Sequence, residues 1–335
     1  MRILVTGGAG YVGSVTVERL VEAGHRVVVL DDLSTGHRAA VAPEARLVVG
    51  RYDDRVVVLA LLGEERIDAV LHCAARSIVG ESVAHPDLYY RENVVGGIAF
   101  LEALRTADVR RLVLSSTAAV YGLPDVSPIP EEVPLAPINP YGETKRTLEG
   151  AIRWYGSAFG LRSISLRYFN VAGASERNGE RHDPETHLIP LVLAAAENGS
   201  AVTVYGTDYP TPDGTCIRDY IHVEDLADAH LAALEATAPG NARTGPADGS
   251  LPLALNLGTA GGYSVREVLA AAERVVGAPI PRRLGERRAG DPPVLVADAT
   301  RAGDVLGWRA RRADLDAILG SAWDWRRRHP EGYPA

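Results

Sequence analysis

The sequence has few lysines, few cysteines and no strongly apolar run. Lysine and arginine together number 35 in the 335 residues, yet Lys145 is the only lysine. The two cysteines, Cys73 and Cys216, have no paired spacing. This excludes a readable disulfide framework or cysteine-based zinc site and fits a reducing compartment such as the cytosol. The net charge of −8 argues against a surface that binds nucleic acid or anionic membranes.

No apolar run approaches the about 20 residues that a membrane span requires. The N-terminus has only three apolar residues between Arg2 and the first glycine, so we expect no secretory signal peptide. Hydrophobic residues make up 46% of the chain, which is typical of a globular protein with one large or two medium domains. We therefore expect a cytoplasmic protein with no membrane partner and no nucleic-acid partner.

The N-terminal region has the pattern of a strand–helix–strand unit. Strands are expected at 3–5 and 27–30, with a helix at 12–22 between them and a glycine-rich turn at 6–13. Such glycines allow a tight turn and a close approach of the backbone to a pyrophosphate at the helix N-terminus. Asp31 follows the second strand, 18 residues past Gly13, and can accept hydrogen bonds from a ribose. Because a carboxylate would repel a 2′-phosphate, the pattern predicts NAD rather than NADP.

Strands and helices continue to alternate up to residue 170. This alternation predicts an α/β fold with a doubly wound parallel Rossmann sheet. Ligands of such sheets bind at the carboxyl ends of the strands. We expect the glycine-rich turn and the residues after each strand to converge there. The expected elements are strands at 46–49, 69–73, 111–114 and 163–167 and helices at 88–106 and 141–159.

The second half has longer loops and suggests a smaller α/β C-terminal domain that selects a substrate. We predict an NAD-binding domain over 1–170, with 218–236 packing back onto it, and a substrate domain over 171–335. Residues 237–252 are expected to form a surface loop. The other expected elements are strands at 202–205 and 253–257 and helices at 187–198, 223–236, 264–276 and 314–327.

Tyr141 precedes the only lysine by four residues, so on a helix the two side chains share one face. Asn139 and Pro140 are typical of an N-cap and a first helical position, which would place Tyr141 in the first turn. There the helix dipole and the ammonium of Lys145 would lower the tyrosine pKa from about 10. Such a tyrosine could act as a general base. The Tyr-x-x-x-Lys spacing also arises by chance, and a surface pair is the alternative, but the retention of a single lysine favours a functional pair.

Several motifs together resemble the extended short-chain dehydrogenase/reductase family and, within it, the UDP-glucose 4-epimerases. The resemblance covers nearly the whole chain, in order. The motifs are Thr6-Gly7-x-x-Gly10-x-x-Gly13, Val79-Gly-Glu-Ser82, Ser115-Ser-Thr-Ala-Ala-Val-Tyr-Gly122, Tyr141-x-x-x-Lys145, Arg167-Tyr-Phe-Asn170, Asp208-Tyr-Pro-Thr211, Arg218-Asp-Tyr-Ile-His222 and His329-Pro-Glu-Gly-Tyr333.

The resemblance implies NAD-dependent 4-epimerisation of a UDP-hexose, from UDP-galactose to UDP-glucose. Hydride would leave C4, the 4-keto sugar would rotate, and hydride would return to the other face. Tyr141 would be the base, Lys145 would lower its pKa and hold the nicotinamide ribose, and Thr117 would lie beside the 4-oxygen. The family also implies a homodimer formed by the helices at 88–106 and 141–159.

Further binding residues follow from the resemblance alone. For NAD they are Gly7, Gly10, Tyr11, Val12, Gly13, Asp31, Asp32, Leu33, Cys73, Ala74, Ala75, Ser77, Asn93, Ser115, Tyr141, Lys145, Tyr168 and Phe169. For the UDP-sugar they are Thr117, Asn170, His187, Leu188, Thr203, Val204, Tyr205, Arg218, Arg288, Asp291 and Leu295, with Thr203 to Tyr205 framing the uracil, Arg218 and Arg288 gripping the diphosphate and Asp291 contacting the uridine ribose.

The chain departs from the family pattern at four places. The acid that often meets the adenine amine is replaced by the segment 50–52, so Asp53 or Asp54 would have to substitute. A lysine common after the fourth strand is Ser77, and of the usual asparagine pair only Asn93 remains. Leu295 stands where the family controls the size of the sugar, and its intermediate size leaves tolerance of N-acetyl sugars open.

The residues around Thr117 and Tyr141 also bear on three alternative functions. A 4,6-dehydratase needs an acid pair beside the active threonine, whereas Ala118 and Ala119 cannot transfer protons. A 4-epimerase of UDP-N-acetylglucosamine, UDP-glucuronate or UDP-xylose would use the same residues. A catalytically silent NAD-binding scaffold would not require an intact Tyr141 and Lys145. His72 and His222 are expected to be hydrogen-bonded core residues, and no spacing of glutamate and histidine suggests a metal site.

Overall fold

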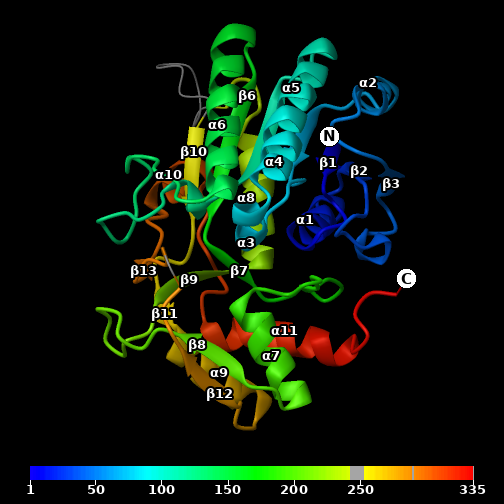
Figure 1. Cartoon of the computed structure of the whole chain (residues 1–335). Helices are drawn as coiled ribbons and strands as arrows, with labels where there is room; N and C mark the ends of the chain where they lie inside the picture. The colour runs from blue at the N-terminus through cyan, green and yellow to red at the C-terminus, as the bar shows by residue number, and fades with distance from the viewer. Residues whose placement is uncertain (242–252, 289, 335) are drawn as a thin grey trace.

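The computed structural model describes residues 1–241, 253–288 and 290–334. Figure 1 shows a larger part built around one sheet and, below it, a smaller part with shorter strands. The expected surface loop at 237–252 lies largely outside the described residues. Within the described part of the chain, every helix is too short or too polar to cross a membrane.

The larger part contains seven parallel strands in the order β10-β6-β5-β4-β1-β2-β3. This confirms the doubly wound α/β fold. The strand order reverses direction around β1, so the carboxyl ends of β1 and β4 flank the point where ligands of such sheets bind. The strands are β1 (Arg2–Thr6), β2 (Arg26–Asp31), β3 (Arg46–Val49), β4 (Ala69–His72), β5 (Arg111–Thr117), β6 (Arg162–Tyr168) and β10 (Leu253–Leu257).

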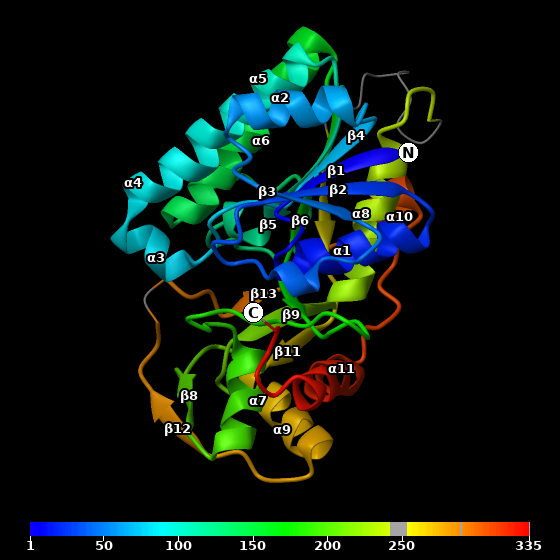
Figure 2. The ribbon, with the colours of Figure 1, turned by 90° about the vertical axis from the view of Figure 1, so that its right-hand side faces the viewer.

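Helices cover both faces of this sheet, as Figure 2 shows. Successive residues of β1 point to opposite faces, so Ile3 and Val5 enter one core and Leu4 enters the other. The first core is closed by α1 (Tyr11–Glu22), α8 (Val223–Ala236) and α10 (Thr300–Leu306). The second is closed by α2 (Arg55–Glu64), α5 (Gly96–Thr106) and α6 (Pro140–Phe159).

The strand at 253–257 was expected among the elements of the second half, and this placement needs correction. In the structure β10 pairs in parallel with β6 and forms the edge of the large sheet. An apolar strand can pair with any sheet edge that is free, and this choice is made by contacts between residues far apart in the sequence. The helix α10, which the sequence did not reveal, packs against β10 and α8.

The smaller part has its own core between two short sheets and three helices. In one sheet β9 pairs with β7, β11 and β13, and in the other β8 pairs with β12. The elements are β7 (Asn170–Ala172), β8 (Val202–Tyr205), β9 (Ile217–His222), β11 (Gly262–Ser264), β12 (Arg282–Gly285), β13 (Val294–Leu295), α7 (Leu188–Asn198), α9 (Val265–Val276) and α11 (Leu315–Arg328).

Two local details differ from the sequence analysis. The helix α2 was not anticipated, although Asp54 caps it by accepting from the backbone N–H groups of Val56 and Val57. The helix expected at 88–106 is built in segments. They are α4 (Pro86–Tyr89), the π-turn η2 (Tyr90–Val95) and α5. A separate short helix, α3 (Val79–Ala84), precedes them, and short 3-10 turns form at η1 (Arg38–Ala40) and η3 (Ala118–Val120).

Candidate active site

The glycine-rich turn lies where β1 passes into α1. Gly7 has a φ of +71°, and a Cβ at this position would lie 2.5 Å from the backbone nitrogen of Ala74. A Cβ on Gly13 would lie 2.1 Å from the carbonyl oxygen of Gly7. Both positions therefore require glycine. Gly10 is the N-cap of α1 and gives it no side-chain cap, so the N–H groups of the first turn, including those of Tyr11 and Val12, are available to an anion.

Asp31 ends β2 beside this turn. Its carboxylate accepts hydrogen bonds from the backbone N–H groups of Ala9 and Leu33, each at 2.9 Å. Burial raises the pKa of this carboxyl. Asp32 is held by the N–H of Ser34 at 3.0 Å. Asp31 therefore fixes the glycine-rich turn to β2 and keeps carboxylate lone pairs for a further donor.

The segment after β4 closes the other side of the turn. The N–H groups of Cys73 and Ala74 donate to the carbonyl of Thr6 at 2.9 and 3.0 Å. Ala75 and Ser77 continue this segment. Asn93, expected to contact the cofactor, bonds instead to both backbone groups of Arg76 and so holds the segment in place.

The two acids considered for adenine binding already have protein partners. Asp53 accepts two hydrogen bonds from the guanidinium of Arg51, each at 2.9 Å. Asp54 caps α2. Each carboxylate therefore already has a protein partner in this structure, Arg51 for Asp53 and the start of α2 for Asp54.

Tyr141 and Lys145 lie on the inner face of α6, opposite the end of β5. Asn139 caps the helix by accepting from the N–H of Gly142 at 2.8 Å, and Pro140 begins it, as predicted. A Cβ on Gly142 would lie 2.5 Å from the carbonyl oxygen of Ala119, so glycine permits this close approach. Tyr141 is thereby brought into hydrogen-bonding contact with the side chain of Thr117. Sequence reasoning missed Gly142.

The pKa of Tyr141 differs from the prediction. Burial raises it to about 12, although the hydrogen bond with Thr117 lowers it in part. The ammonium of Lys145 donates to the carbonyl of Ser115 at 2.8 Å. The predicted lowering by Lys145 is therefore wrong for the ligand-free protein, because desolvation of the phenol dominates.

Lys145 lies in a nearly dry environment. Only 3% of the residue is exposed, and burial lowers its pKa to about 8. Ser115, whose carbonyl accepts from Lys145, also places its hydroxyl 3.2 Å from the sulfur of Cys73 and 2.8 Å from the Nε2 of His230. The end of β5 is therefore fixed from three sides.

A buried polar network behind α6 was missed by the sequence analysis. Glu149 forms an ion pair with Arg167 at 2.6 Å, and both side chains are at most 8% exposed. Arg167 also donates to the hydroxyl of Tyr121 at 2.9 Å, which in turn donates to Asn256 at 2.7 Å. Glu149 follows Lys145 by four residues, so helical spacing on the face of Tyr141 could have revealed it.

The groups expected to bind the UDP-sugar lie mainly in the smaller part. Arg218 forms an ion pair with Asp291, although the two were expected to bind different portions of the ligand. The guanidinium of Arg288 lies 4.1 Å from the ring centroid of Tyr205. Thr203 accepts a hydrogen bond from Arg283 at 2.8 Å. Each of Arg218, Arg288 and Thr203 thus has a partner within the smaller part. Val204 is buried in the core between β8 and the helices.

The residues that join the two parts follow β6. Phe169 is buried in a small apolar cluster with Ala118, against which Leu295 packs. Leu295 therefore lies near the end of β5, which carries Thr117. Asn170 begins β7, and Leu188 begins α7. His187 stands at the N-cap position of α7 without a capping side-chain hydrogen bond, and its Nδ1 contacts the carboxylates of Glu180 and Glu185.

His72 and His222 are held by hydrogen bonds within the core. His72 lies 2.7 Å from the hydroxyl of Thr6, and burial lowers its pKa to about 3. His222 accepts from the N–H of Glu224 and lies 3.0 Å from Ser321. The charge of Lys145 also contributes to the lowered pKa of His72.

The site has the features that NAD requires. The glycines at 7 and 13 let the backbone of the turn pack tightly against Ala74 and against itself, α1 presents an uncapped N-terminus, and a carboxylate lies at the end of β2. The conserved chemistry of such sites is a pyrophosphate over the turn and a ribose on the carboxylate. A hydroxyl of the nicotinamide ribose would accept a hydrogen bond from the ammonium of Lys145.

Comparisons with known proteins agree with this geometry. Residues 3–244 match the NAD dependent epimerase/dehydratase family. The chain is 52% identical to a UDP-glucose 4-epimerase of Streptomyces lividans, over 99% of this chain and 98% of that protein. It is 44% identical to the crystal structure of a Brucella ovis UDP-glucose 4-epimerase in complex with NAD, with a TM-score of 0.90 over 97% and 98% of the two chains. A Bifidobacterium longum UDP-glucose 4-epimerase in complex with NAD⁺ and UDP is 35% identical, with a TM-score of 0.91 over 99% and 100%.

Proposed function

This chain belongs to the NAD dependent epimerase/dehydratase family, and we propose that it is an NAD-dependent 4-epimerase that converts UDP-galactose to UDP-glucose. The observation that carries the proposal is the contact of Tyr141 with Thr117, next to Lys145, at the carboxyl end of a parallel sheet. Ala118 and Ala119 follow Thr117 where a dehydratase needs acids, which favours epimerisation over elimination.

We propose that residues 1–170 form the NAD-binding part and residues 171–335 the part that binds the UDP-sugar, with β10, α8 and α10 completing the NAD-binding part.

The protein supplies a base, an orienting hydroxyl and a dry environment. The glycine-rich turn, Asp31 and Lys145 would hold NAD, which would supply the hydride acceptor and donor for C4 of the sugar. Tyr141 removes the proton from the 4-hydroxyl and gives it back after the 4-keto sugar has rotated. Thr117 accepts or donates a hydrogen bond at the same oxygen. Burial raises the pKa of Tyr141 to about 12, so the phenol would act as a base only with a stabilising positive charge nearby.

Rotation of the 4-keto sugar requires that only the UDP portion is held firmly. We propose that Arg218 and Arg288 grip the diphosphate, that Asp291 meets the uridine ribose, and that Thr203 to Tyr205 frame the uracil. Charge-assisted hydrogen bonds from arginine to phosphate suit this role. Since Arg218 and Asp291 pair with one another in the absence of ligand, substrate binding would exchange this ion pair for contacts to UDP.

We also propose a homodimer that uses the face of α4, η2, α5 and α6. Support comes from large apolar side chains that this face exposes. Trp154 is 72% exposed, Val95 is 65% exposed, and Phe159 is 47% exposed. Two copies that buried these residues against one another would remove them from water.

We further propose a cytoplasmic location, which the free cysteines Cys73 and Cys216 support.

Conversion of UDP-galactose by purified protein with no added NAD tests the proposed function. We expect UDP-glucose to form and a near-ultraviolet band of reduced nicotinamide to appear transiently. A parallel reaction with UDP-N-acetylgalactosamine shows whether Leu295 leaves room for an N-acetyl group. No turnover of UDP-galactose even with NAD supplied would contradict the proposal, and a missing reduced band would favour a silent scaffold.

A further inference from the structure

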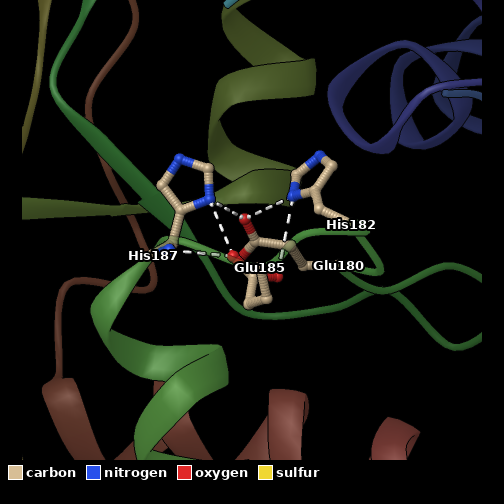
Figure 3. A group of neighbouring side chains, drawn as sticks. All are labelled: Glu180, His182, Glu185 and His187. Atoms are coloured by element: carbon tan, nitrogen blue, oxygen red, sulfur yellow. Dashed lines mark hydrogen bonds and ion pairs between the residues drawn. The ribbon is translucent and has the colours of Figure 1, made fainter. Parts of the chain in front are cut away.

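Four side chains from one loop converge between β7 and α7. The loop carries Glu180, His182, Glu185 and His187 within eight positions, and one ligand atom from each lies within 4.8 Å of the others. Figure 3 shows both imidazole rings turned with one nitrogen toward the two carboxylates and the other away from them. The sequence analysis expected no metal site, because the spacing of these residues fits no common helical or hairpin pattern.

The distances between these atoms match those between ligands of a small metal ion. The Nδ1 of His187 lies 2.8 Å from Glu180 Oε1 and 3.2 Å from Glu185 Oε1. The Nδ1 of His182 lies 3.3 Å from Glu180 Oε1 and 3.7 Å from Glu185 Oε2. In a tetrahedral site with bonds of about 2.0–2.2 Å, neighbouring ligand atoms are about 3.3–3.5 Å apart. Since the four ligand atoms all lie within 4.8 Å of one another, the widest pair would have to approach by about 1 Å for the atoms to surround one ion.

The carboxylates are held in place before any ion binds. Glu180 and Glu185 have side chains that are only 7% and 18% exposed. One oxygen of Glu185 accepts from the backbone N–H groups of Thr186 and His187 at 2.7 and 2.8 Å. Two half-desolvated carboxylates this close to each other repel unless a cation lies between them.

The Nδ1 of His182 is a second, independent indication. This nitrogen is buried, and in the described part of the chain it makes no hydrogen bond. It lies close to Glu180, but its orientation does not suit a hydrogen bond. The His182 side chain is 30% exposed, but its buried Nδ1 faces two carboxylates without a well-directed hydrogen bond, so its lone pair could bind a metal ion.

The competing explanation is that protons neutralise the cluster. Burial lowers the pKa of His187, but hydrogen bonds and charge from Glu180 and Glu185 outweigh it and raise the pKa to about 10. Two imidazolium rings would then balance two carboxylates. In this arrangement His182 pairs with Glu180 and Glu185 at 3.3 and 3.7 Å in a poor hydrogen-bond geometry, whereas a metal ion would be bound by all four ligand atoms.

We propose that Glu180, His182, Glu185 and His187 bind one Zn²⁺ ion. Two imidazole nitrogens and two carboxylate oxygens form a ligand set that suits this metal. Because four protein ligands complete a tetrahedral shell, the ion would have a structural role and would not activate water.

The site lies against the turn that we propose for the NAD pyrophosphate. The hydroxyl of Tyr11 donates to the carbonyl of Gly173 at 2.6 Å, and its ring meets that of His182 edge-on at 6.4 Å. His37 lies 3.2 Å from the carbonyl of Arg181. The ion would therefore fix the loop at 173–187 against the start of α1. Only this last consequence depends on the proposed function.

Metal binding to the full-length protein tests the proposal directly. The protein is treated with a chelator, dialysed and titrated with Co²⁺, whose visible absorption reports a tetrahedral site, and then with Zn²⁺. We expect one equivalent of Co²⁺ per chain and its displacement by Zn²⁺. Absence of a tetrahedral Co²⁺ spectrum in the wild-type protein would overturn the proposal.

Variants locate the ion. In His182→Gln and Glu185→Gln, we expect affinity for Zn²⁺ to fall by at least about 100-fold, since even outer residues of zinc sites change affinity by about 10–100-fold. His85→Gln, which changes a histidine outside the cluster, should bind like the wild type. Unchanged uptake in the double variant His182→Gln/Glu185→Gln would place the ion elsewhere. Turnover of UDP-galactose is measured separately, so failure of the proposed function leaves this result interpretable.

Discussion

The two sides of the candidate site differ in what holds their side chains before a ligand binds. Around Tyr141 and Lys145, neutral hydroxyls and backbone carbonyls provide the partners, and these partners belong to the sheet. On the opposite side, Arg218 and Asp291 are paired with each other. The first side therefore has its partners within the sheet, whereas the second, in the proposed function, would exchange its ion pair for contacts to a charged ligand.

Burial explains this difference. The ammonium of Lys145 is 3% exposed, so any change of partner would leave a charge in a dry environment. The side chain of Asp291 is 26% exposed, and water can compensate while Arg218 moves from the carboxylate to a phosphate. In the proposed function, a rigid position suits Lys145 beside the reacting sugar, and an exchangeable ion pair suits Arg218 and Asp291, which would bind the UDP portion.

Tyr141→Phe should give the largest effect on the rigid side. The variant keeps the ring and loses only the hydroxyl that transfers the proton. We expect the rate of UDP-galactose conversion to fall by about 10²–10⁴-fold, the usual contribution of a general base. The content of bound NAD, measured after denaturation, should not change. Conversion at the wild-type rate would show that another group is the base.

Glu149→Gln tests whether the rigid side depends on its buried network. Removal of the carboxylate leaves Arg167 buried without its counter-charge, and breaking a buried pair costs about 3–5 kcal/mol. We expect the free energy of unfolding, from urea denaturation, to fall by roughly this amount. Glu143→Gln on the same helix removes an exposed pair with Arg146 and should cost less than about 1 kcal/mol. Equal losses in the two variants would refute a special role for the buried pair.

Arg288→Ala tests the exchangeable side. Loss of a charge-assisted contact worth about 1.5–3 kcal/mol should raise KM for UDP-galactose about 10–100-fold with little change in kcat. Arg287→Ala is the matched control, because Arg287 lies over Tyr209 at 4.4 Å and pairs with Asp208. Its KM should change by about twofold or less. If both variants raise KM equally, the effect comes from the loop and not from a specific contact.

The titration of Lys145 gives the smallest effect and needs no variant. Because the chain has one lysine, selective ¹³C labelling of lysine yields one side-chain signal in a nuclear magnetic resonance spectrum. We expect its titration midpoint at about 8 in the ligand-free protein, compared with 10.5 for an exposed lysine. A midpoint above 10 would mean that the ammonium reaches water.

The same shift sets the sign of a pH effect on stability. The folded-state pKa of Lys145 lies below the unfolded one, so burial of the ammonium destabilises the fold below pH 8. This cost decreases as the pH rises from 8 to 10.5. The contribution is at most about 1.4 kcal/mol for each pH unit.

Local patterns predicted the cofactor half of the fold well. The glycine-rich turn, the acid after β2 and the cap formed by Asn139 and Pro140 each involve residues a few positions apart. Ser264 and Glu267 likewise form the capping box at the start of α9, where a helix was expected to begin. Such signals depend on backbone geometry within one or two turns, which a sequence displays directly.

Long-range features could not be predicted in this way. The sequence did not show that β10 joins the large sheet, because any open edge satisfies a short apolar strand. It gave the wrong direction for the pKa of Tyr141, because desolvation depends on everything that packs around the phenol. The pairing of Arg218 with Asp291 joins residues 73 positions apart.

The sequence by itself determined which residues stand at the strand ends and on one face of α6, because strand alternation and helical periodicity are local. Only the tertiary structure decided which charges meet. It brought Glu149 to Arg167 and turned Glu180, His182, Glu185 and His187 toward one another within an irregular loop. The physical reason is that loop conformation and burial are set by the contacts of the whole chain, and charges respond to burial more strongly than to sequence spacing.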